Sequence, residues 1–324
     1  MASRESLDDK LAAIRSLRGE SLNQDQVAEL RKRIGDRSNL VVAAAAAIAG
    51  DNTLADLAGD LEKAFDRFLV NPLKDDKLCR AKLAIVQALD KMEHPRTDVF
   101  VKAARHVQLE PVWGGTEDSA PPLRAAALVA LARAEGTGSL PVLVDAMADP
   151  ARDVRIASAV ALGAVGSEAA GLVLRLKVRL GDKDPDVFSE CLGGLLAVEA
   201  TANLPIVTEF LDPTDPVACE AAAMALGRSR LAEALDPLKD CLQRCHSAEL
   251  RQQLLLAIAI LRRPGATDYL IELVATAEEE TMACEALSAL RIYKEDSRLR
   301  ERIAGPVREK GSPTLQSAFD REFR

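Results

Sequence analysis

Cys241, Cys245 and His246 form the one local cluster of potential metal ligands in the 324-residue sequence. The two cysteines are four residues apart, so in a helix they share a face, and Leu238 and Leu242 lie on that same face. A structural zinc site needs four ligands, and no second cluster in the sequence supplies the others. The pattern therefore predicts buried structural thiols, and we assign neither a metal nor a cofactor.

The other residues with catalytic potential are isolated. His94 precedes a proline in a predicted turn, and His106 ends a predicted helix. Gly114-Gly115 lacks the Lys-Ser/Thr that follows the glycines of a phosphate-binding loop. No serine stands in a Gly-x-Ser-x-Gly setting. We therefore assign no catalytic residue, and the sequence argues against an enzyme without settling the question.

The elements that would position a site are repeated helix pairs, shown most clearly from Asp149-Pro150 onwards. That dipeptide signals a turn, and Asp153 stands near the helix start, where a carboxylate meets free backbone N–H groups. An alanine-rich amphipathic helix follows and stops at Gly166. A second helix is predicted from about residue 168 to 179, with apolar residues along one face: Leu172, Leu176 and Leu180.

The same spacing of apolar residues relative to the helix start recurs along the chain. Residues equivalent to Val154 are the predicted anchors of the first helices: Leu40, Leu78, Leu123, Val187, Val217, Leu250 and Met282. From Leu123 onwards the steps between anchors are about 32 residues, and a fixed period of this length indicates a helical solenoid. One helix pair cannot cover its own apolar face, so neighbouring pairs must stack.

This unit resembles the HEAT-like repeats first described in phycobilisome lyases. The resemblance rests on these residues: Asp149-Pro150, Asp153-Val154-Arg155, Ala159, Ala161-Leu162-Gly163 and Gly166, with weaker copies at Asp184-Pro185 with Asp186-Val187 and at Asp215-Pro216-Val217 with Ala225-Leu226-Gly227. It covers about residues 38–310. It implies an all-α fold, a right-handed α-α superhelix or solenoid of about eight helix pairs with capping helices.

We expect one continuous solenoid domain. Its predicted parts are N-terminal capping helices at 1–37, HEAT-like repeats 1–2 at 38–106, an inserted loop at 107–122, repeats 3–8 at 123–310, and a C-terminal cap or tail at 311–324.

The inserted loop contains the single tryptophan, Trp113. The step from Leu78 to Leu123 is 45 residues, longer than the repeat period. Insertions in repeat proteins form loops on one face, often the binding face, and tryptophan is enriched at binding hot spots. Two readings stay open: Trp113 folds back into a gap between repeats, or it contacts a partner.

Composition narrows the partner class and the compartment. The net charge is −8 and the pI about 5.2, whereas nucleic-acid binders usually carry a basic stripe and a high pI. No apolar run reaches the roughly 18 residues of a membrane span. No signal peptide is visible, and the six cysteines lie within helical patterns. We expect a cytoplasmic protein with reduced thiols that does not bind a membrane, and the charge disfavours nucleic acid as a partner.

The leading hypothesis is a non-catalytic scaffold or adaptor that binds an unidentified protein along the solenoid surface, with its own oligomeric state left open. We expect the second helices to line the concave side. The predicted partner-binding residues are Trp113, Glu110, Arg175, Arg179, Glu209, Lys239, Arg244 and Glu272.

The resemblance also carries alternatives. The runner-up is a phycobilin-lyase-like enzyme or enzyme subunit acting on a partner protein, and nucleic-acid binding ranks third. HEAT-like repeats also build the iron enzyme deoxyhypusine hydroxylase, which uses paired His-Glu dipeptides. No histidine here is followed by glutamate, so that activity is not expected.

Overall fold

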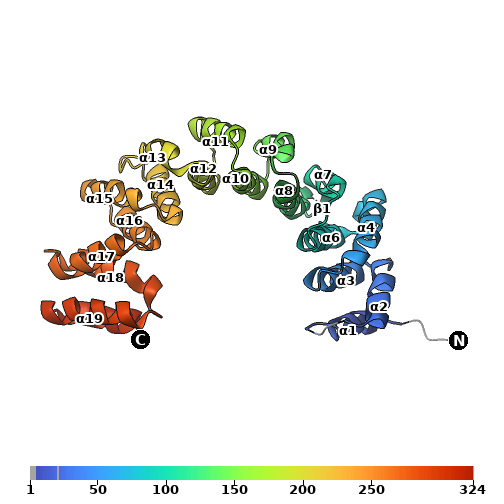
Figure 1. Ribbon diagram of the computed structural model, residues 1–324, viewed down its shortest axis with the longest axis horizontal. Coiled ribbons are helices and arrows are strands. Elements are labelled where there is room, and N and C mark those ends of the chain that lie inside the picture. Colours follow the sequence, from blue (N-terminus) through green and yellow to red (C-terminus); the bar gives the residue numbers. More distant parts are fainter. Residues whose placement is uncertain (1–4, 20–21, 324) are drawn as a thin grey trace. The chain divides into compact units, whose positions relative to one another are not determined.

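The structure is a computed structural model that describes residues 5–19 and 22–323 (Figure 1). Helices dominate these residues, and successive helices along the chain pack against one another. The predicted all-α solenoid fold is therefore confirmed. The chain divides into two compact units, unit 1 (Met1–Ser167) and unit 2 (Glu168–Arg324). The prediction of one continuous domain stays a prediction.

Unit 1 begins with two helices that pack on the first repeat, α1 (Leu7–Arg15) and α2 (Gln24–Ile34). The first helices of its repeats are α3 (Asn39–Asp51), α6 (Arg80–Lys91), α8 (Pro121–Glu135) and α10 (Arg152–Val165). Their second helices are α4 (Ala58–Val70), α7 (Asp98–Ala104) and α9 (Leu140–Ala146). The short helix α5 (Pro72–Asp75) follows α4, and the strands β1 (Leu109–Val112) and β2 (Gly115–Asp118) lie between α7 and α8.

Unit 2 continues the alternation. Its first helices are α12 (Pro185–Val198), α14 (Pro216–Ser229), α16 (Ala248–Ile260) and α18 (Glu280–Leu290). Its second helices are α11 (Glu168–Leu180), α13 (Ala200–Thr208), α15 (Leu235–Arg244), α17 (Pro264–Thr276) and α19 (Ser297–Lys310). The last helix, α20 (Pro313–Glu322), packs against α18 and α19.

The first helices form one closely packed layer in each unit, and the second helices form another. In unit 2, α12, α14, α16 and α18 contact one another in series. Figure 1 shows this layer on the inner side of the unit's curve, with the second helices on the outer side. The expectation that second helices line the concave side is therefore wrong. The first helices carry the smaller side chains at their contacts and therefore pack more closely. In a curved stack, the more closely spaced layer lies on the inner side of the curve.

Glycine and alanine at the contacts allow this close spacing. A Cβ atom on Gly50 of α3 would lie 2.7 Å from the Ala88 Cα of α6. In unit 2, a Cβ atom on Gly227 of α14 would lie 2.6 Å from the Ala257 carbonyl oxygen of α16. Both distances are shorter than van der Waals contact, so only glycine fits at these crossings.

Four of the predicted anchors are correct, since Leu123, Val154, Val187 and Leu250 are buried. Four are displaced by one to four residues. Leu78 and Val217 are exposed, and Leu40 and Met282 are only half-buried. The buried residues in their place are Val41, Lys82, Cys219 and Ala283. Of these four, Leu78 lies outside its helix, in the turn before α6. Leu40, Val217 and Met282 lie in the first turns of α3, α14 and α18, on a face that is less buried than expected.

The predicted helix after Asp149-Pro150 is α10, and it ends at Gly166 with φ 64°, a left-handed conformation that glycine adopts without strain. The predicted second helix is α11, but its inward face differs from the expected one. Ala170, Leu174 and Val178 are buried. The leucine stripe that the sequence suggested is exposed on α11: Leu172, Leu176 and Leu180.

Among the described residues, one segment, Pro121–Ala146, is long and apolar enough to cross a membrane by length and composition. It comprises α8 and α9 with a bend between them at Gly136, where φ is 53°. Helix α8 packs against α6, α7 and α10. Core helices of a repeat can have the same length and composition, and the structure places α8 and α9 within such repeats.

The glycine contacts predict opposite effects for two Gly→Ala substitutions. Gly227→Ala should lower the free energy of unfolding by about 1–3 kcal/mol, because the new methyl group collides with the α16 backbone. Gly193→Ala in α12, where nothing lies within 4 Å of the added Cβ, should raise it by up to about 1 kcal/mol through helix propensity. Urea denaturation of the full chain measures both, and equal midpoints for the two variants would contradict the account.

Candidate functional site

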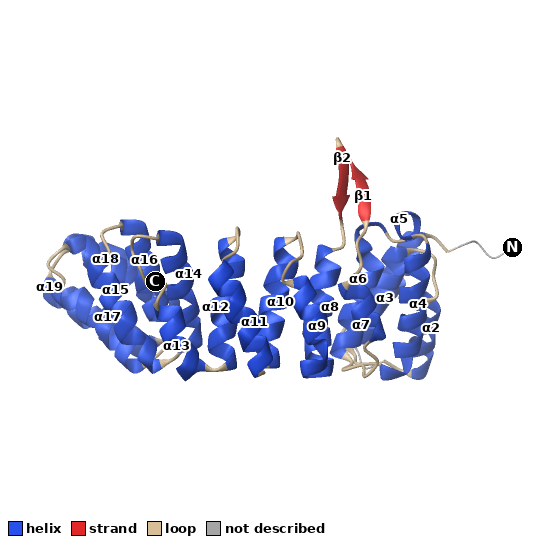
Figure 2. Cartoon of the chain, turned by 90° about the horizontal axis from the view of Figure 1, so that it is seen from above, coloured by secondary structure: helices blue, strands red, loops and turns tan. Residues whose placement is uncertain are grey.

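The predicted insertion at 107–122 folds as a β-hairpin that extends beyond the helix ends of unit 1 (Figure 2). Strands β1 and β2 are antiparallel, with Leu109 opposite Asp118 and Val112 opposite Gly115. Trp113 and Gly114 form the two-residue turn, and Gly114 adopts φ 90°. The sequence analysis expected a loop here. The Gly114-Gly115 pair between two short β-compatible runs was the signal for a hairpin.

The tip of the hairpin is apolar and exposed. Trp113 has a relative accessibility of 104%, and Val112 is exposed next to it, while Leu109 is exposed at the other end of β1. The reading in which Trp113 fills a gap between repeats is therefore wrong, and its contact with a partner stays a prediction. An apolar tip of this kind is costly in water unless another surface covers it.

Gln108, buried at the root of the hairpin, connects it to the helices. Its Oε1 accepts hydrogen bonds from Lys82 Nζ at 2.7 Å and Cys79 Sγ at 3.3 Å. Its Nε2 donates to the Asp76 carbonyl at 2.9 Å and to Glu110 Oε1 at 2.7 Å. The amide thus uses both donors and its acceptor, which fixes its orientation and holds the start of β1 in place.

Lys82 and Asp76 form an ion pair with both side chains at 0% accessibility, Nζ lying 3.5 Å from Oδ2. Asp76 also accepts the backbone N–H groups of Ala81 and Lys82, at 2.8 and 3.1 Å, at the start of α6. Lys82 is the third residue of its helix, as Val41 is in α3 and Leu123 in α8. A charge therefore occupies a position where those two repeats bury an apolar side chain.

Lys82 was not predicted from the sequence as the buried residue, because Leu78 was taken as the anchor of this helix. The spacing of the anchors is uneven around Leu78, and this irregularity could have indicated the displacement.

Two further titratable side chains lie beside Lys82 at the Gln108 Oε1 atom, Cys79 and His106. Burial raises the pKa of the Cys79 thiol to about 11. Burial lowers the pKa of His106, whose Nε2 lies 3.2 Å from Gln108 Oε1. Burial therefore disfavours the charged form of both side chains that share the amide oxygen with Lys82.

Glu110, predicted as a partner-binding residue, holds a strained turn, and its role in binding stays a prediction. Its Oε1 accepts the Leu78 N–H at 2.5 Å and the Ser119 hydroxyl at 2.6 Å. Leu78 and Cys79 have φ of 60° and 51°, a left-handed conformation that costs residues other than glycine about 1–2 kcal/mol each. Burial opposes ionisation of Glu110, but these hydrogen bonds outweigh it and hold its pKa below its ordinary value.

The far side of the root is fixed by Arg124 of α8. Its guanidinium contacts Asp118 of β2 at 2.7 Å and Asp149 at 2.9 Å, and all but 3% of its side chain is buried. Burial opposes ionisation of Asp118. The backbone N–H groups of Ala120 and Gln108, together with Arg124, outweigh that effect and hold the pKa of Asp118 below its ordinary value. Both strands are therefore anchored in the helices of unit 1.

The remaining predicted partner-binding residues lie in unit 2, on or next to the second helices, and several have partners within the chain. Arg179 pairs with Glu209 at 2.7 Å, which joins α11 to the end of α13. The Lys239 ammonium lies 4.7 Å from the Tyr269 ring centroid. Arg244 donates to the Leu211 carbonyl at 3.0 Å. Arg175 and Glu272 are exposed on α11 and α17. The structure does not bring this set to the hairpin, and its role in binding stays a prediction.

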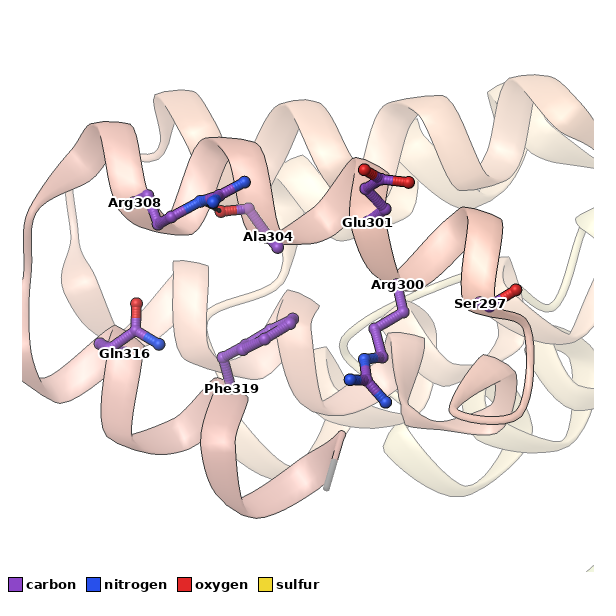
Figure 3. A pocket seen from close by; sticks show the side chains of 7 residues that line it. All are labelled: Ser297, Arg300, Glu301, Ala304, Arg308, Gln316 and Phe319. Atoms are coloured by element: carbon purple, nitrogen blue, oxygen red, sulfur yellow. Dashed lines mark hydrogen bonds between the residues drawn. The ribbon is translucent and has the colours of Figure 1, made fainter.

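A hollow lies between α19 and α20 in unit 2, with a volume of about 530 Å³ (Figure 3). Its lining residues are Ser297, Arg300, Glu301, Ala304, Arg308, Gln316 and Phe319. Figure 3 shows the Phe319 ring between Gln316 and Arg300. That ring stacks on Phe323 with centroids 5.1 Å apart. Polar helix-surface residues make up most of this hollow, and it lacks the locked framework of the hairpin root.

The cysteines behave as buried thiols. Cys241 and Cys245 are buried in α15 and at its end, as predicted. Cys241 Sγ lies 3.4 Å from Cys219 Sγ of α14, a pair the sequence did not reveal. This hydrogen bond, with burial, raises the pKa of Cys219. Over residues 5–19 and 22–323, no three His, Cys, Asp or Glu side chains gather as metal ligands would.

The buried ion pair predicts a large effect for Lys82→Met. The substitution leaves the Asp76 carboxylate and the Gln108 amide buried without their cation, so we expect a loss of about 3–5 kcal/mol in unfolding free energy. Lys102→Met is the matched control, because Lys102 pairs with Asp66 on the surface and such pairs contribute about 0–1 kcal/mol. Fluorescence anisotropy of Trp113 should also fall in Lys82→Met as the hairpin loosens. An unchanged midpoint and anisotropy would refute the anchoring role.

Among known proteins, the chain matches one family model over more than half of its length. No curated protein sequence matches the chain. The complex of CpcE and CpcF of phycocyanin lyase from Nostoc sp. PCC7120 is similar with TM-score 0.38 and 16% identity, covering 89% of this chain and 95% of that chain. An engineered protein is similar with TM-score 0.37 and 17% identity, covering 99% and 95%. The family model for HEAT repeats matches residues 115–187, 173–259 and 204–291, more than half of the chain. The chain belongs to the HEAT-repeat family.

Proposed function

We propose that this protein is a non-catalytic scaffold that binds another protein through the exposed tip of its hairpin. The observation that carries the proposal is Trp113, fully exposed at the end of a hairpin whose root is anchored by buried hydrogen bonds and ion pairs. Tryptophan supplies a large contact area with few rotatable bonds, and it is enriched at binding hot spots.

The rigid root supports the proposal on energetic grounds. A contact residue on a flexible loop loses conformational freedom when it binds, and that loss weakens the complex. Gln108 and Arg124 fix both strands before any partner arrives. The apolar tip is therefore presented in a defined place, which reduces the entropy lost on binding.

The other functions considered for the sequence have less support. The chain carries a net charge of −8, which disfavours a polyanionic partner along the whole solenoid. No contact among the described residues favours a phycobilin-lyase-like activity over a scaffold. Cytoplasmic location stays an expectation from the sequence.

The proposal predicts that Trp113→Ala weakens partner binding without destabilising the fold. Truncating a tryptophan hot spot typically costs about 2 kcal/mol or more, close to thirtyfold in affinity. Partners would first be identified by photo-cross-linking from an unnatural amino acid at position 113, and the affinity of each would then be measured with purified protein. The melting temperature should not change, because the side chain contacts solvent.

Val217→Ala is the matched control, since Val217 is an exposed apolar residue on α14 of unit 2 and not part of the hairpin. A cross-linker at position 217 should not capture the same partner. Equal affinity of the Trp113→Ala and Val217→Ala variants for the cross-linked partner would eliminate the hairpin as the contact element.

A further inference from the structure

A groove runs along the root of the hairpin between β1 and the turn that precedes α6. It has a volume of about 800 Å³, within the range of about 300–1,000 Å³ typical of ligand pockets. Figure 2 shows α5 and the hairpin on the same side of unit 1. The lining residues are Asn39, Leu40, Leu73, Lys77, Leu78, Arg80, Glu110 and Pro111.

The walls of the groove are apolar and open to solvent. Leu73 is 48% and Leu78 53% exposed, and Pro111 of β1 lies opposite them. Leu78 is held there by its left-handed backbone and by the hydrogen bond from its N–H to Glu110. Strained residues of this kind cluster at binding sites, where the surrounding structure maintains them. The turn thus holds the exposed Leu78 side chain in the wall of the groove.

The rim of the groove is cationic. Lys77 and Arg80 are exposed, and neither side chain has a hydrogen bond or ion pair within the described part of the chain. The one acidic lining residue, Glu110, already accepts hydrogen bonds from three donors. Asp76, next in the turn, is buried against Lys82. Two exposed cations that form no ion pair thus lie beside exposed leucines in a chain whose net charge is −8, and Glu110 is the anion of the lining that interacts with Lys77.

We propose that this groove binds an acidic peptide segment of a partner protein, with leucine-like side chains packed on Leu73, Leu78 and Pro111. Its carboxylates would pair with Lys77 and Arg80. This inference rests on the proposed scaffold function and names the chemistry of the partner. A nucleic acid backbone has no apolar side chains to pack against the walls of the groove. Apolar walls together with a cationic rim therefore favour an acidic peptide over a nucleic acid. Pro111 lacks an N–H group, so strand addition at β1 is not the basis of recognition.

The test uses three fluorescein-labelled ten-residue synthetic peptides and the full-length chain. The first alternates Glu or Asp with Leu; the second replaces each acidic residue by Lys; the third replaces each Leu by Ser. We expect a saturable rise in anisotropy with the first peptide alone. Its affinity should fall as NaCl rises from about 0.05 M to about 0.5 M, because salt screens exposed charges.

Two variants localise the binding. Lys77→Glu should weaken the first peptide about three- to tenfold, since it removes one exposed ion pair and adds a repulsion. Lys63→Glu is the matched control, an exposed lysine on α4 outside the groove, and should leave the affinity within about twofold. Leu73→Ser should weaken binding by about fivefold or more, and Val217→Ser should not.

Three outcomes would overturn the inference. Equal binding of the leucine and serine peptides would show that the protein attracts any polyanion and that the apolar walls make no contribution to binding. Equal losses for Lys77→Glu and Lys63→Glu would show attraction to net charge rather than to the groove. Absence of binding by the first peptide would show that the groove does not take this ligand. In each case cross-linking from position 113 still reports separately on the scaffold function, so the two proposals fail independently.

Discussion

The hairpin of this protein depends on one buried charge. Lys82 takes a position in its helix at which the neighbouring first helices bury Val41 and Leu123. An ammonium group cannot stay buried without partners, because desolvation would cost several kcal/mol. Asp76 supplies the carboxylate and Gln108 the amide oxygen. These two partners come from the turn before α6 and from the base of β1, so satisfying the charge brings both segments together.

The solenoid supplies the platform for that arrangement through close helix packing. Where Gly50 meets Ala88, the helices approach too closely for any side chain beyond hydrogen. The first helices of each unit therefore form a dense layer, and the more loosely spaced second helices lie outside it (Figure 1). The root of a hairpin inserted between two repeats of such a layer contacts closely packed helices on both sides, here α6 and α8. Its root can then be rigid while its tip stays in solvent.

The hairpin side of unit 1 combines exposed apolar side chains with a root of buried polar contacts. The leucine stripe on α11 is exposed too, but it lies on a helix of the repeat and not on an inserted hairpin. At the hairpin, Glu110 connects the strained turn at Leu78 to β1. The apolar tip and the cationic groove therefore keep a fixed relation to each other, as expected for two parts of one binding surface.

The helix pairs, their period and the family could be predicted from local signals, such as the helix stop at Gly166 and the recurring anchors. The insertion and its tryptophan could be predicted as well. Contacts between distant segments, in contrast, place Trp113 in solvent, Leu78 outside its helix and Lys82 in the buried position. Those outcomes depend on contacts between residues about 25 to 40 positions apart, such as Lys82 with Gln108 and Gly50 with Ala88. No local pattern encodes that Leu78 is exposed and Lys82 is buried, because the partners that packing brings near decide which side chain lies inside.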